Sequence, residues 1–200
     1  MAINLQKGQK VSLKKKSVGL GEILVNLNWN ARAPKKGFLG GLFGGSSAID
    51  LDLGCLYELK DGRKGAVQAL GNSFGSLHTA PYISLDGDDR TGESTEGENL
   101  RINGDHIAEI KRILVYTFIY EGVVNWQQAD GIVTIRYPGE EDLIVKMDEY
   151  NSNSKMCALA LLENVNDETF SVEKLIRFFP SHRPMDEAFH WGLRWTPGRK

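Results

Sequence analysis

The stretch AIDLDLGCLYEL, residues 48–59, decides the fold because its side chains alternate with a period of two. One face collects the apolar members Ile49, Leu51, Leu53, Cys55, Tyr57 and Leu59. Asp50 and Asp52 project side by side from the opposite face. Such alternation is typical of a β-strand with one face on a core. The stretch therefore predicts a strand that carries two neighbouring carboxylates.

The same period recurs along the rest of the chain. EILVNLNW (22–29) places Ile23, Val25, Leu27 and Trp29 on one face. RILVYTFIY (112–120) is apolar on both faces, which is typical of a central strand. Hairpin turns are expected at KDGRKG (60–65), PGEE (138–141) and VNDE (165–168). About nine short strands separated by turn signals predict an all-β protein, an antiparallel β-sandwich.

A single helix is expected, close to the C-terminal end of the sequence. RPMDEAFHWG (183–192) has Pro184 in its first turn and Gly192 as its stop signal. Trp191 and Trp195 have helical spacing there and are expected to pack in the core or against the sheet. The sandwich is therefore predicted to end with a short C-terminal helix.

Length and composition favour one soluble domain that spans residues 1–200. The formal net charge is −2, which gives no whole-protein reason to expect nucleic-acid binding. No apolar run approaches the roughly twenty residues that a membrane-spanning helix needs, so a cytoplasmic location is expected. Cys55 and Cys157 lie in apolar strand-like runs and are expected to be reduced core residues.

The stretch DGDDRTGESTEGEN (86–99) concentrates negative charge in a glycine-rich loop. It contains Asp86, Asp88, Asp89, Glu93, Glu96 and Glu98 against a single Arg90. These carboxylates repel each other unless solvent and salt screen them or a cation joins them. Hard oxygen ligands without nearby Cys or His favour Ca²⁺ over zinc or copper, and their number favours Ca²⁺ over Mg²⁺. A plain solvated acidic loop remains the alternative.

A calcium site here must differ from the EF-hand. Counted from Asp86, the twelfth position is Gly97, where the EF-hand loop needs Glu. Asp50 and Asp52 point the same way from their strand. A loop that folds over the end of that strand can therefore share a cation with both aspartates.

The insertion APKKGFLGGLFGGSS (33–47) interrupts the strand pattern with a glycine-rich segment. It carries Phe38, Leu39, Leu42 and Phe43 with Lys35 and Lys36 before them. Apolar tips with basic collars suit an anionic membrane surface or a groove on a partner, so Phe38, Leu42 and Phe43 are candidate docking residues. The alternative is a loop that is disordered or packed on its own domain.

Signatures of catalysis are missing from the sequence. The glycine cluster lacks the Gly-Lys-Ser/Thr of a phosphate loop, no G-x-S-x-G is present, and the four histidines have no zinc spacing. We therefore expect a protein that is not an enzyme. The alternative is an enzyme that uses the acidic cluster to hold Mg²⁺ or Ca²⁺ for phosphoryl chemistry.

Several motifs together resemble the TerD-type family of tellurium-resistance proteins, also described as calcium-binding stress proteins. They are INLQKGQKVSL (3–13), GLGEILVNLNWN (19–30), AIDLDLGCLYEL (48–59), LDGDDRTGESTEGEN (85–99), IKRILVYTFIYEG (110–122) and CALALLEN (157–164). The C-terminal MDEAFHWGLRW (185–195) is similar to the TerA branch of that family. The resemblance covers essentially the whole chain.

The resemblance implies a β-sandwich that binds Ca²⁺ between the Asp-Leu-Asp strand and the acidic loop. The implied ligands are Asp50, Asp52, Asp88, Asp89, Glu93, Glu98 and Asn99, with Asp86 as an additional candidate. Asn30, Asn99 and Leu100 stand where the family usually has acidic residues, so weaker calcium binding is expected.

The function implied is that of a non-enzymatic calcium-binding module in a bacterial tellurite-resistance and stress-response system. Its expected partners are other tellurium-resistance proteins, with which it would assemble in an ion-dependent manner, and the inner-membrane surface. The alternative is a Ca²⁺-dependent membrane adaptor.

Overall fold

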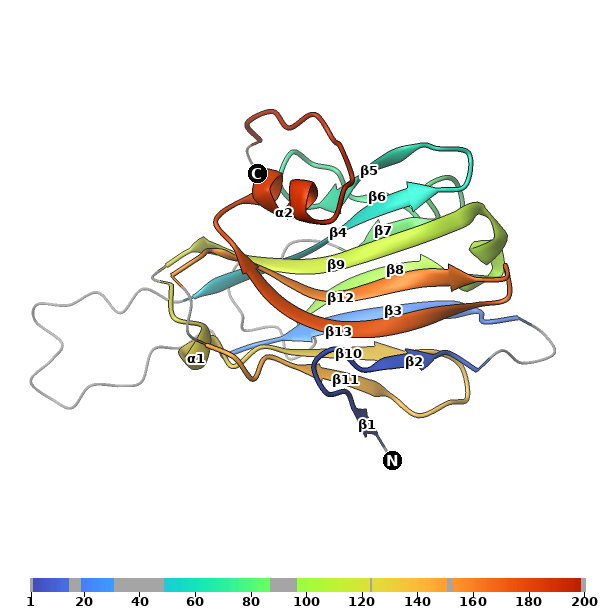
Figure 1. The fold of residues 1–200 in the computed structure, drawn as a ribbon, viewed down its shortest axis with the longest axis horizontal. Coiled ribbons are helices and arrows are strands. Elements are labelled where there is room, and N and C mark those ends of the chain that lie inside the picture. The colour runs from blue at the N-terminus through green and yellow to red at the C-terminus, as the bar shows by residue number, and fades with distance from the viewer. Residues whose placement is uncertain are drawn as a thin grey trace, which may run out of the picture.

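The chain folds into two β-sheets that pack against each other (Figure 1). The computed structural model describes residues 2–14, 19–30, 49–86, 97–122, 124–150 and 153–198. The predicted all-β sandwich is confirmed. The apolar side chains that alternate along the strands of both sheets meet in one cluster between the layers.

The first sheet has seven strands, and all adjacent pairs except one are antiparallel. Its order is β1 (Ile3–Asn4), β11 (Leu143–Lys146), β10 (Ile132–Arg136), β3 (Glu22–Asn28), β8 (Glu98–Asn103), β7 (Ile83–Leu85) and β6 (Gly75–Ser76). The exception is β1, which runs parallel to β11 at one edge. The hairpin predicted around residues 138–141 joins β10 to β11.

The second sheet has six strands. It contains the strands that were predicted at residues 48–59 and 112–120. Its order is β2 (Lys10–Ser12), β13 (Thr169–Phe179), β12 (Met156–Val165), β9 (Ile110–Glu121), β4 (Asp50–Leu59) and β5 (Lys64–Gln68). β9 lies between β12 and β4, which confirms that the stretch 112–120 is central.

The helical content differs from the prediction of one helix at residues 183–192. The C-terminal helix α2 runs His182–Ala188, so Pro184 is its third residue and Gly192 lies beyond its end. Two further short helices, η1 (Gly104–Glu109) and α1 (Trp126–Ala129), were not predicted. Each helix is preceded by an asparagine whose side chain accepts a backbone N–H of the first turn. Both helices are too short to show an apolar period, so this cap is the local sequence signal for them.

The strand count also exceeds the prediction of about nine, because the described residues contain 13 strands. Four of the additional strands have only two or three residues, which is too short for an alternating pattern to be recognised. β8 has the inward set Glu98, Leu100 and Ile102, but its acidic first residue made it look like part of the loop.

The second sheet is covered on its outer face as well. A second apolar cluster there joins residues of β4, β9, β12 and β13 to Met185 and Trp191. Figure 1 shows α2 and the C-terminal segment lying over this sheet. Trp191 is 1% exposed and Trp195 packs on the same cluster, as expected, but both follow the helix.

Cys55 and Cys157 are buried free thiols, which confirms their prediction as reduced core residues. None of the helices in the described parts of the chain has the length and apolarity that crossing a bilayer requires.

Candidate metal centre

The two predicted strand carboxylates lie at the start of β4. Leu51 and Leu53 belong to the core between the sheets, so alternation directs Asp50 and Asp52 to the other face. Both aspartates are buried, with Asp50 7% and Asp52 0% exposed, which the sequence pattern did not predict. β4 pairs with β9 from Asp50 onward, whereas its pairing with β5 begins at Gly54.

Glu98 brings the end of the acidic stretch to this part of β4. It is the first residue of β8 and is 2% exposed. Its Oε2 accepts the backbone N–H of Leu53 at 2.5 Å. The carboxylate thus links the two sheets at a point one residue from Asp52.

Gly97 sets the direction in which the chain enters β8. Its φ is +65°, a left-handed conformation that L side chains rarely adopt. A Cβ at this position would lie 2.1 Å from the carbonyl oxygen of Leu27. Only glycine therefore allows the acidic stretch to pass this close to β3 before Glu98 turns inward.

Asp50, Asp52 and Glu98 are buried carboxylates near the start of β4, with Glu98 on the core side of the sheet and the two aspartates on the opposite side. An ionised carboxylate is costly to bury unless hydrogen bonds or an opposite charge compensate it. Oxygen donors of this kind match Ca²⁺ better than zinc or copper. The donor chemistry of Asp50, Asp52 and Glu98 therefore fits the predicted ion.

The described residues supply only part of the predicted ligand set. Within them, no group of three or more His, Cys, Asp or Glu side chains is arranged to hold a metal ion by itself. Asp88, Asp89 and Glu93 lie outside the described residues. The docking residues Phe38, Leu42 and Phe43 lie outside them as well.

Asp86 has a different environment from the one predicted. Its two carboxylate oxygens accept the Arg101 Nε–H at 2.8 and 2.6 Å, and Arg101 also donates to Glu22 at 2.5 Å. The hydrogen bonds with Asp86 and Glu22 raise the pKa of the Arg101 guanidinium. Asp86 is therefore engaged by an arginine, a residue whose role the sequence analysis missed.

Asn99 also points away from the strand carboxylates. It follows Glu98 in β8, so its side chain lies on the opposite face of the sheet. There its Oδ1 accepts Asn26 Nδ2–H at 2.8 Å, and Asn26 in turn accepts from Asn28 at 2.6 Å. The structure thus brings Glu98 to β4 but places Asn99 in an asparagine ladder between β3 and β8.

Trp29 and Asn30, which follow β3, bond to the start of β4 and to α1 respectively. The Trp29 indole N–H donates to the Ile49 carbonyl at 2.9 Å, directly before Asp50. The Asn30 backbone N–H donates to Ala129 in α1 at 2.7 Å. The sequence pattern identified Trp29 as an inward-facing residue, but not this bond to the segment that leads into β4.

Comparisons with known proteins agree with this architecture. The family model described as "TerD domain" matches residues 1–169. The tellurium resistance protein TerA of Alcaligenes sp. is 46% identical over 190 residues, which are 95% of this chain and 56% of TerA. TerX of Serratia marcescens is 34% identical over 61% of this chain and 64% of TerX. The chain thus spans somewhat more than half the length of these curated relatives.

A solved structure with a similar fold is that of a homologue of the telluride resistance protein TerD from Streptomyces coelicolor A3(2). It superposes with a TM-score of 0.58 over 84% of this chain and 95% of that chain. The sequence identity is 18%, so this likeness concerns the fold alone.

Proposed function

Because this chain belongs to the TerD-domain family, whose matched relatives are tellurium-resistance proteins, we propose that it is a calcium-binding module without enzymatic activity. It would serve a bacterial tellurium-resistance and stress-response system by assembling with related proteins when calcium is bound. The observation that carries the proposal is the approach of Glu98 to β4, one residue from the buried Asp52.

The proposed ligand set combines strand and loop. Asp50 and Asp52 would hold the ion from β4, and Glu98 would hold it from β8. Calcium takes roughly six to eight oxygen ligands, so further donors are required. Asp88, Asp89 and Glu93 precede Glu98 in the sequence and are the proposed source. Bound calcium would supply positive charge among these carboxylates and connect the two sheets.

Calorimetric titration of calcium into chelator-stripped protein tests the metal site. We expect at least one site in the wild-type chain, together with a calcium-dependent rise in melting temperature, because an ion that binds only the folded state stabilises it. Asp52→Asn and Glu98→Gln should each weaken binding at least about tenfold, since affinity in such sites follows the number of carboxylates. An unchanged melting temperature on adding calcium would contradict the proposal.

Two features make the variants informative. Glu98→Gln keeps a side-chain oxygen that can accept the Leu53 N–H, so the link between the sheets is preserved while the charge is lost. Glu149→Gln is the matched control, because Glu149 is exposed and its ion-pair partner among the described residues is Lys7. Equal weakening by Glu98→Gln and Glu149→Gln would indicate a general charge effect instead of a site.

The assembly role is tested separately by sedimentation of the chain mixed with a second tellurium-resistance protein of the family. We expect a complex that forms with calcium and dissociates when a chelator is added. A complex that Asp52→Asn forms as readily as the wild type would contradict ion-dependent assembly while leaving the calcium site itself intact.

A further inference from the structure

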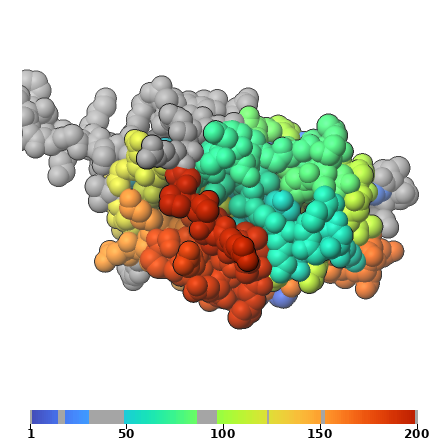
Figure 2. All heavy atoms as spheres, turned by 90° about the horizontal axis from the view of Figure 1, so that it is seen from above, coloured from blue at the N-terminus to red at the C-terminus, as the bar shows by residue number. Residues whose placement is uncertain are grey.

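A second candidate site lies on the outer face of the second sheet, far in sequence from the acidic stretch. A cavity of about 990 Å³ opens between β5, the turn at residues 70–73, the start of α2 and the C-terminal residues 193–198. Figure 2 shows this C-terminal segment, in red, lying beside the turquoise part of the chain that includes β5. The volume reaches the upper end of the usual range for small-molecule sites, roughly 300–1,000 Å³.

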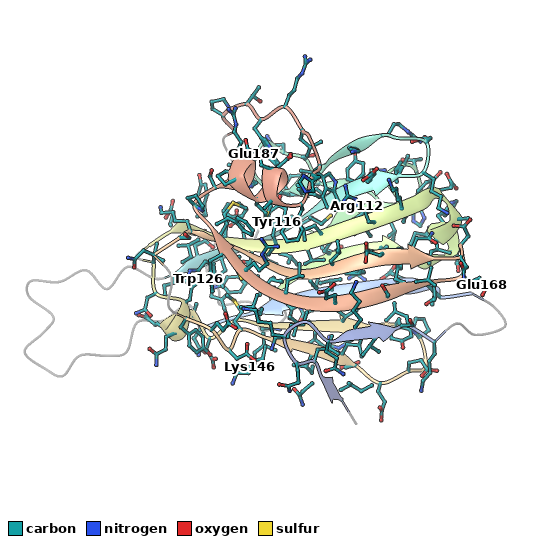
Figure 3. All side chains as sticks on the ribbon, in the orientation of Figure 1. Arg112, Tyr116, Trp126, Lys146, Glu168 and Glu187 are labelled. Carbon is teal, nitrogen blue, oxygen red and sulfur yellow. The ribbon has the colours of Figure 1, made fainter. Side chains whose placement is uncertain are left out.

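A network of polar groups underlies the cavity, and Gln68 and His182 of this network contribute to its lining. Gln68 is 7% exposed. Its Oε1 accepts hydrogen bonds from the Tyr116 hydroxyl at 2.6 Å and from His182 Nε2 at 2.9 Å. Figure 3 shows Tyr116 on β9, on the side that faces α2. Burial lowers the pKa of His182 to about 4, so its ring is neutral near pH 7. The ring is therefore held in one orientation without contributing charge.

The aromatic wall of the cavity is also fixed in place. Asp186, 3% exposed, accepts the backbone N–H groups of Gly192 at 2.6 Å and Leu193 at 2.9 Å. The same carboxylate accepts the Trp195 indole N–H at 2.9 Å. The Trp195 ring lies 4.7 Å from the His182 ring, centroid to centroid. Side chains held in this way lose little further freedom when a ligand binds.

The charge around the cavity is positive. Lys64, Arg183 and Arg194 contribute to the lining, whereas no Asp or Glu occurs among the described residues that form it. Lys64 already donates to the Trp191 carbonyl at 3.1 Å. Arg183 and Arg194 are exposed, and neither has an ion pair with any residue that the structure describes. Two guanidinium groups thus remain available to an anion.

We propose that this cavity binds a small ligand that carries a phosphate group and a planar ring. Arg183 and Arg194 would bind the phosphate, because the planar guanidinium group of arginine can donate two parallel N–H bonds to phosphate oxygens. Trp195 would stack against the ring. The proposal goes beyond calcium binding, and neither the two arginines nor Trp195 belongs to the proposed metal site.

Titration calorimetry of the 200-residue chain with phenyl phosphate tests this assignment. Two separate titrations serve as controls: inorganic phosphate carries the charge without the ring, and phenol carries the ring without the phosphate. We expect phenyl phosphate to bind more tightly than either. The Arg183→Gln/Arg194→Gln double variant should weaken binding of phenyl phosphate about 10- to 100-fold, because charge-assisted hydrogen bonds are lost. Both arginines are exposed, so the variant should melt like the wild type.

The matched control is Arg136→Gln/Lys146→Gln, which removes the same charge from β10 and β11. Figure 3 shows Lys146 on the side of the molecule away from α2. The control should bind phenyl phosphate within about twofold of the wild type, because distant sites act independently. Equal weakening in both double variants would overturn the proposal, as would a phenyl phosphate affinity no higher than that of inorganic phosphate.

A second measurement locates the ligand in the cavity. The indole N–H resonance of Trp195, assigned by comparison with a Trp195→Phe variant, should shift on addition of phenyl phosphate. The resonances of Trp126 and Trp191, which are each 1% exposed, should not shift. An unmoved Trp195 resonance at saturating ligand would overturn the proposal.

Discussion

Glu58 is a single residue that connects the second sheet to the C-terminal segment. Its side chain is 6% exposed and accepts Lys111 at 2.8 Å and Arg112 at 2.6 Å. Arg112 also donates to the carbonyl oxygens of Phe189 at 3.0 Å and His190 at 3.1 Å. Its guanidinium lies 3.8 Å above the Trp191 ring. One buried carboxylate thus positions the arginine that attaches the segment after α2.

Replacing Glu58 by Gln should destabilise the fold in a manner that depends on pH. Burial alone would raise the Glu58 pKa, but hydrogen bonds from Lys111 and Arg112 outweigh it and lower the pKa. The ionised form is therefore favoured by folding, and its contribution is present above the unfolded pKa of about 4.3 and lost as pH falls through the folded pKa. We expect a loss of about 1.5–3 kcal/mol at pH 7.

Denaturant unfolding at a series of pH values checks this. The difference between the wild type and Glu58→Gln should narrow as the pH falls below about 4.3. Glu149→Gln, which removes an exposed ion pair, should change the free energy of unfolding by no more than about 1 kcal/mol. A difference for Glu58→Gln that stayed constant down to pH 3 would contradict the role of its charge.

The turn that follows α2 is an element organised by the Asp186 carboxylate. Asp186→Ala removes its three acceptor contacts with Gly192, Leu193 and Trp195. We expect a destabilisation of about 2–3 kcal/mol and a red shift of tryptophan fluorescence, because the Trp195 ring loses its anchor. Asp61→Ala is the control, since Asp61 is exposed and, within the described part of the chain, accepts hydrogen bonds from Arg63, two residues further on. Similar unfolding curves for both variants would show that the turn does not depend on Asp186.

The long strands were predictable because apolar residues alternate along each of them. Ile23, Val25 and Leu27 are fully buried, as the alternation of β3 required. The second apolar face of β4 was not predictable in the same way. Leu56 is buried there by contacts with a cluster that includes Met185 and Trp191, and no local pattern reports the arrival of residues so distant in sequence.

The candidate metal site shows the same division. The pairing of Asp50 with Asp52 follows from the period of one strand. The residues suggested only that the acidic loop could fold over the end of this strand. The family resemblance named Glu98 as a ligand, because its approach depends on how β8 is placed against β4. The resemblance also implied Asn99 as a ligand, and Asp86 was an additional candidate because its side chain is acidic. Strand geometry turns Asn99 away from Glu98, since neighbours in a strand face opposite sides, and Arg101 binds Asp86.

At the scale of the whole molecule, the two cysteines report on global unfolding. Burial raises the pKa of Cys55 to about 12 and also raises the pKa of Cys157, so neither forms the reactive thiolate near neutral pH. Their strands, β4 and β12, are separated by β9. We expect neither thiol to react promptly with Ellman's reagent in the native protein, whereas both should react in concentrated guanidinium chloride. Prompt labelling of the native chain would contradict this protection.

The Glu98 contact with Leu53 also bears on how the molecule avoids unwanted association. At Leu53, β4 pairs with β9 on one side. On its other side, the pairing with β5 begins only at Gly54, so no described strand pairs with Leu53 there. A backbone N–H exposed at such a margin is a template on which a foreign chain can add itself. Because a buried carboxylate already occupies this donor, an approaching strand would find no vacant amide at Leu53. The same side chain that would serve an ion thus discourages edge-to-edge aggregation.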